Sequence, residues 1–135
     1  MGVICKYKFD SSIYADFIPE FNSGYSGYVI TDEVEGNIIT RTIESDKSPT
    51  MIRFGRKWVN GETATDNRTD SLLEILTLNA SITNAESMFR YCKNLTTLDL
   101  SGFDTANVTN MSSMFNACSS LTSLELSSFD TSNVT

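Results

Sequence analysis

Residues 83–89 read TNAESMF and residues 109–115 read TNMSSMF, so one phrase occurs twice, with Thr83 matched to Thr109. The same offset relates the rest of the unit: Cys92 to Cys118, Leu95 to Leu121, Leu98 to Leu124, Leu100 to Leu126, and the Phe-Asp-Thr of residues 103–105 to that of residues 129–131. A shorter copy of the leucine pattern lies at Leu73, Leu76 and Leu78, at a slightly smaller interval that matches Leu76 to Leu98. Self-similarity at such a period indicates stacked repeats.

Each unit combines two periodicities. The leucines of residues 95–100 end in the alternation that is typical of a half-buried strand. Apolar residues of stretches 82–92 and 108–118 recur at three- and four-residue steps, which predicts short helices near 84–92 and 110–118. Thr83 and Glu86 have the spacing of a capping box at the start of the first. One unit cannot bury both its strand leucines and the apolar face of its helix. We therefore expect parallel strands near 76–78, 98–100 and 124–126 to stack in one sheet, with these helices on the other side.

Residues 108–135 read VTNMSSMFNACSSLTSLELSSFDTSNVT and closely resemble the BspA-type leucine-rich repeat. The resemblance covers residues 72–135, about 2.5 repeats. That family occurs in bacterial surface proteins, surface lipoproteins and fibre-like proteins encoded by phages and prophages. The resemblance implies a role in adhesion or protein contact and carries over no catalytic residue. Because no polar cap covers the last apolar layer, we expect the sequence to be a fragment of a longer repeat protein.

Residues 1–68 contain no repeat and predict a small all-β domain in front of an α/β solenoid of residues 69–135. Residues 3–9 alternate as a strand does, and residues 28–43 predict a hairpin whose turn lies at residues 35–37. Residues 50–58 predict another strand. The opening segment loosely resembles the N-termini of phage tail or fibre proteins with the same repeats, which implies an anchoring domain. We expect the repeat half to keep its fold without it.

The composition restricts the possible functions. A formal net charge of −7 disfavours nucleic acid as a partner, because acidic surfaces repel phosphate. The sequence contains no histidine, which excludes imidazole-based triads, and three cysteines without a Cys-x-x-Cys pair. No apolar run is long enough for membrane insertion or a signal peptide. We therefore expect a protein that is not an enzyme, with no catalytic residues, metal or cofactor.

Two groups of residues are candidates for contact with partners. The exposed strand positions predict a binding surface, with solvated spacers as the alternative: Thr97, Asp99, Ser101, Ser123, Glu125 and Ser127. The single basic cluster is a candidate for docking on an acidic partner subunit, with a solvated strand end as the alternative: Arg53, Arg56, Lys57 and Trp58.

Two functions fit these features. The first is a tail fibre or baseplate component of a phage or phage-tail-like particle, assembled in the cytoplasm, with an attachment domain and a host-facing repeat region. The second is an excerpt of a bacterial cell-surface adhesin. Both imply protein partners in a larger assembly or a receptor on a host cell, and either protein could form a homo-oligomer.

Overall fold

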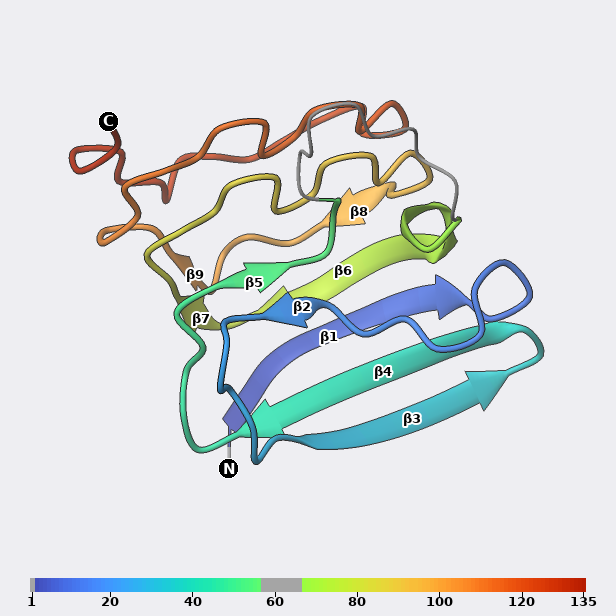
Figure 1. The fold of residues 1–135 in the computed structure, drawn as a ribbon. Helices are drawn as coiled ribbons and strands as arrows, with labels where there is room; N and C mark the ends of the chain where they lie inside the picture. Colours follow the sequence, from blue (N-terminus) through green and yellow to red (C-terminus); the bar gives the residue numbers. More distant parts are fainter. Residues whose placement is uncertain (1, 57–66) are drawn as a thin grey trace.

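A computed structural model describes residues 2–56 and 67–135 (Figure 1). The elements formed by these residues are β1 (Gly2–Asp10), β2 (Glu20–Phe21), β3 (Val29–Glu35), β4 (Ile38–Ser45), β5 (Ile52–Arg53), a 3₁₀ helix (Thr69–Ser71), β6 (Leu72–Leu78), β7 (Ala80–Ser81), β8 (Thr97–Leu98) and β9 (Phe103–Asp104). No α-helix occurs among the described residues. The described chain accordingly has no helix with the length and apolar character to cross a membrane.

The main sheet has five strands in the order β3-β4-β1-β6-β8. From Cys5 to Phe9, β1 alternates as predicted: Cys5, Tyr7 and Phe9 are fully buried, whereas Lys6 and Lys8 lie on the outer face. The alternation predicted for residues 3–9 is interrupted at Ile4, which is also buried, because the pairing with β4 shifts register there. The predicted hairpin is also confirmed, because β3 and β4 pair antiparallel around a two-residue turn. Gly36 takes a φ of 61° at the first turn position, which is the requirement of a type II′ turn.

The repeat strands pair in parallel as predicted, but in a different register. In the β6–β8 pair, Ile75 lies opposite Leu98, whereas the leucine pattern indicated Leu76 for that place. β7 pairs with β9 with the same offset, which puts Ala80 level with Phe103. The predicted third strand at 124–126 is wrong: these residues form no strand, and Leu124 is 38% exposed. The third leucine segment (residues 121–126) separates from the second (residues 95–100) and forms no strand pairing with it.

The predicted helices near 84–92 and 110–118 are also wrong, because both stretches fold as consecutive turns. Hydrogen bonds join Met88 N–H to Ala85 C=O and Cys92 N–H to Phe89 C=O, as in successive tight turns. Ser87 takes a φ of 56°, and Ser113, at the equivalent position of the next repeat, takes 55°. A left-handed residue every few positions is incompatible with a right-handed helix. The predicted capping box is absent, and Glu86 N–H bonds to the Asn84 side chain instead.

The turns of one repeat stack on those of the next through alternate peptide groups. Four N–H groups donate to carbonyls of the following repeat at 2.9 Å: Ala85 to Asn110, Ser87 to Ser112, Phe89 to Met114, and Tyr91 to Asn116. The intervening N–H groups close the turns. The apolar residues predicted to face inward do so, since Ile82, Ala85, Met88, Phe89 and Cys92 are at most 1% exposed. The periodicity therefore identified the buried face correctly and the backbone conformation wrongly.

Residues 50–56 form the first layer of this stack, although their sequence lacks the repeat phrase. Thr83 N–H donates to Thr50 C=O at 2.9 Å, and Phe54 N–H donates to Met88 C=O at 2.8 Å. β1 also pairs with β6, so the sheet continues from the N-terminal half into the repeats. One hydrophobic core includes residues from both halves. The division of the chain at residue 68 stays a prediction.

Candidate functional site

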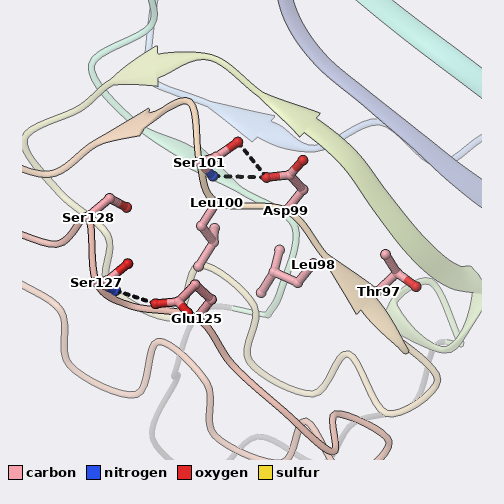
Figure 2. A pocket seen from close by; sticks show the side chains of 8 residues that line it. All are labelled: Thr97, Leu98, Asp99, Leu100, Ser101, Glu125, Ser127 and Ser128. Carbon is pink, nitrogen blue, oxygen red and sulfur yellow. Dashed lines mark hydrogen bonds between the residues drawn. The ribbon is translucent and has the colours of Figure 1, made fainter.

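A pocket of about 360 Å³ lies between the second and third leucine segments (Figure 2). Its lining comes from two adjacent repeats: Thr97, Leu98, Asp99, Leu100 and Ser101 from one, and Glu125, Ser127 and Ser128 from the next. Thr97 and Leu98 form β8, the last strand of the main sheet, so the pocket lies at that edge of the sheet.

The pocket exists because the two segments are tied together only on either side of it. On one side, Asp130 N–H donates to Thr105 Oγ1 at 2.8 Å. On the other, Tyr91 N–H donates to Asn116 C=O at 2.9 Å. Among the described residues, no backbone hydrogen bond joins residues 95–101 to residues 121–128. The unmade strand pairing thus leaves the space that the pocket occupies.

Two carboxylates in the pocket are held by the same local motif. Asp99 Oδ1 accepts hydrogen bonds from Ser101 N–H at 2.9 Å and Ser101 Oγ at 2.7 Å, and Glu125 Oε1 accepts one from Ser127 N–H at 2.8 Å. Hydrogen bonds from Ser101 lower the pKa of Asp99, and hydrogen bonds from Ser127 lower that of Glu125. Both side chains are therefore anionic at neutral pH. Each carboxylate is exposed and fixed in direction by its own turn.

Five of the six candidate binding residues line this pocket, and they come from two repeats as the sequence suggested. Ser123 does not join them; it lines a separate hollow of about 290 Å³ with Phe115, Cys118, Leu121, Thr122 and Leu124. The sequence interpretation missed Leu98 and Leu100, which it assigned wholly to the core, and Ser128. Ser128 aligns with Gly102 of the preceding repeat, so it adds a side chain at a place where that repeat has none. This difference is the one signal in the sequence that could have identified Ser128.

Of the four residues of the basic cluster, the structure describes Arg53 and Arg56. Arg53 is only 3% exposed, and its guanidinium donates to Glu86 C=O at 3.0 Å and to the Glu20 carboxylate at 2.9 Å. Arg53 therefore links β5 to β2 and to the turns of residues 84–92 inside the molecule, so its side chain does not belong to an exposed docking surface. Arg56 is half-buried, and its carbonyl accepts from the Arg90 guanidinium at 3.1 Å. Lys57 and Trp58 lie outside the described residues.

The cysteines occupy buried or half-buried places and are free thiols: Cys5, Cys92 and Cys118. Burial raises the pKa of all three thiols, which keeps them in the poorly nucleophilic protonated form. In residues 2–56 and 67–135, no three acidic or cysteine side chains lie close enough together to hold a metal ion.

Comparison with known protein families finds a match over the second half of the chain. Residues 66–135 match the family model described as "Mycoplasma protein of unknown function, DUF285". Neither the curated proteins nor the solved structures contain a match to the chain. The matched segment covers just over half of the 135 residues and contains every residue that lines the pocket.

Proposed function

This chain belongs to the DUF285 family, and from that premise we propose that it is a non-enzymatic structural or adhesion protein of the BspA-type leucine-rich-repeat class. Its ligand site in this proposal is the pocket between the second and third leucine segments. A stack of repeats supports such a role, because it presents side chains from successive layers to one ligand. The pocket volume of about 360 Å³ is also within the usual range of binding pockets.

The observation that carries the proposal is the pair of fixed carboxylates beside leucines. Asp99 and Glu125 supply negative charge, Leu98 and Leu100 supply apolar contact, and serine hydroxyls supply hydrogen bonds. A lysine or arginine side chain complements this combination, since it carries a cationic head on an apolar stem. The proposed ligand is therefore a basic side chain on the surface of a partner protein.

The biological setting is proposed in two forms. In the first, the protein is a tail fibre or baseplate component of a phage or tail-like particle, with residues 1–68 towards the particle and the repeats towards the host. In the second, it is part of a bacterial cell-surface adhesin. Antibodies against the chain should label purified tail-like particles in the first case. Labelling of the cell envelope without particles would move the adhesin to first place.

The pocket is tested by nuclear magnetic resonance titration with N-acetyl-arginine amide as the probe. We expect chemical-shift changes confined to residues 97–101 and 125–128, and a loss of affinity of about tenfold or more in the variant Asp99→Asn/Glu125→Gln, because charged hydrogen bonds are the strong ones. The pKa values of both carboxyls are lowered, so binding should persist through the ordinary carboxylate range and be lost only as the pH falls through the lowered values.

Asp130→Asn is the matched control. Asp130 accepts from Ser132 N–H at 3.0 Å in the same turn motif, and its pKa is lowered by hydrogen bonds from Ser132, but it lies outside the pocket lining. The control should bind the probe as the wild type does. Equal losses in both variants, or shifts away from the pocket, would reject this ligand site.

A further inference from the structure

β3 is an open edge of the main sheet, lying beyond β4 with no further strand beside it among the described residues (Figure 1). All seven of its residues are exposed, and the strand includes Val29, Ile30 and Val34, which are 45%, 36% and 68% exposed. Its register with β4 is regular from end to end. The strand contains no proline, lysine or bulge, three of the devices by which proteins usually block such edges.

The pairing with β4 defines which peptide groups are free. The type II′ turn makes Glu35 and Ile38 the closing pair of the hairpin. In an antiparallel pair, hydrogen-bonded and non-hydrogen-bonded residues alternate. The N–H and C=O groups of Ile30, Asp32 and Val34 therefore point away from β4, as a row of donors and acceptors at the spacing that an added strand requires.

The two faces of this edge differ in chemistry. Ile30 and Val34 lie on the core face with Asp32 between them, and the Arg41 guanidinium pairs with Asp32 through bonds of 2.7 and 2.6 Å and also with Asp16. That face therefore presents two apolar side chains on either side of an ion-paired aspartate. Glu33 and Glu35 lie on the opposite, outer face and make it acidic. A complementary strand needs apolar residues on one face and basic residues on the other.

The molecule contains an internal example of this complementarity. β1 alternates buried apolar side chains with Lys6 and Lys8, and Lys8 Nζ lies 3.5 Å from a carboxylate oxygen of Glu74 on the neighbouring β6. β1 therefore pairs with an acidic neighbour by apolar contact on the core face and by charge on the outer face. β3 offers the same acidic outer face to a strand beyond it.

A second copy of β3 fits its own edge poorly in the two registers that would pair the whole strand. Antiparallel pairing centred on Asp32 would put two aspartates directly opposite each other, and parallel in-register pairing would oppose Glu33 and Glu35 with their own counterparts. Like charges on directly opposite residues destabilise a sheet. The acidic side chains thus disfavour self-association while attracting a basic strand.

We propose that β3 is a docking edge for an extended segment of a partner protein, in which apolar residues alternate with lysine or arginine. The segment adds a sixth strand to the main sheet by main-chain hydrogen bonding. β3 and β8 are opposite edges of this sheet, so the docking edge lies away from the pocket. Both sites can be occupied together, and the protein can bridge two partners.

The test uses an end-capped peptide in which lysine and valine alternate, titrated into Asp99→Asn/Glu125→Gln protein so that the pocket does not contribute. We expect binding with a Kd below about 1 mM that weakens with salt, together with slowed amide exchange at residues 30, 32 and 34. Val34→Pro should weaken binding by about tenfold or more, because it removes an outward N–H that the fold itself does not use. Val34→Thr keeps that N–H and should retain binding.

Three results of the peptide titrations would overturn the proposal. They are no binding at about 1 mM peptide, equal binding by Val34→Pro and wild type, and equal binding of a peptide with a central proline, which cannot continue the ladder. A concentration-dependent homodimer that Val34→Pro abolishes would assign the edge to a second copy and equally overturn it. Unchanged spectra of Val34→Pro away from β3 establish that the variant is folded. The arginine probe of the pocket should bind the single variant Val34→Pro normally, so the two sites succeed or fail separately.

Discussion

Four phenylalanines form a column through the molecule, and the last three come from successive layers of the stack. Phe17 stacks on Phe54 at 6.4 Å, Phe54 on Phe89 at 5.8 Å, and Phe89 on Phe115 at 5.6 Å, with interplanar angles of 7°, 11° and 12°. Tyr7 fixes the first ring in place, because its hydroxyl donates to Phe17 C=O at 2.6 Å. The first two phenylalanines come from the N-terminal half and the last two from the repeats. The column therefore binds the two halves at the level of single side chains.

The position of a ring in this column should decide its contribution to stability. Phe89 is fully buried between two rings, so Phe89→Ala should lower the free energy of unfolding by about 3–5 kcal/mol. Phe115 is half-buried at the end of the column, and its replacement by alanine should cost clearly less. Thr97→Ala, on the exposed face, should change stability by less than about 0.5 kcal/mol. Urea denaturation measures all three; equal losses for the two phenylalanines would contradict this account of the column.

At the scale of elements, the alternation of apolar and polar residues was enough to predict strands. An apolar periodicity of three to four residues was not enough to predict helices. β1 and the β3–β4 hairpin could be predicted, because a period of two fits only an extended chain with one buried face. The apolar steps of residues 82–92 fit consecutive turns as well as a helix, and side-chain spacing does not reveal the positive φ of Ser87. Residues 50–56 could not be recognised as a layer, since they share the backbone role of the repeats without their phrase. The pocket residues were predictable only as exposed strand positions, because the separation of the two leucine segments is a tertiary effect.

The turn conformation predicts an effect of glycine that a helix would not give. Ala117 has a φ of 61°, in the left-handed region where a side chain costs roughly 1–2 kcal/mol. Ala117→Gly should therefore stabilise the protein, by up to about 1 kcal/mol after the larger backbone entropy of glycine is counted. Ser112→Gly is the control, because Ser112 is exposed in the same stretch without a positive φ, and it should be mildly destabilising. Destabilisation by both variants in thermal melts would favour a helical conformation there.

At the scale of the whole molecule, the described residues behave as one layered body. β1 lies between β4 and β6 and pairs with both, so the central strand of the N-terminal half is also the neighbour of the first repeat strand. Gly55 permits a close approach between the halves, because a Cβ there would lie 2.2 Å from Arg90 N and 2.5 Å from Ser87 O. The apolar side chains of β6 complete their burial against residues of the N-terminal half. The N-terminal half is thus a cap for the stack, whatever else it binds.

This shared core changes what removal of residues 1–68 should do. The sequence alone led us to expect that the repeats keep their fold without this segment. In the structure, the deletion removes β1 from the edge of β6 and Phe54 from the face of Phe89, and it leaves Leu72 and Ile75 without their cover. An isolated stack of this size also has fewer layers than the three or so that repeat proteins need.

Residues 69–135 alone should therefore show poorly dispersed amide resonances and no cooperative melt. Mixing them with a separate peptide of residues 1–68 should restore the wild-type spectrum, because the missing layer and strand return together. A cooperative melt and a native-like spectrum from residues 69–135 alone would instead establish two independent domains, and would return the N-terminal half to the role of a detachable anchor.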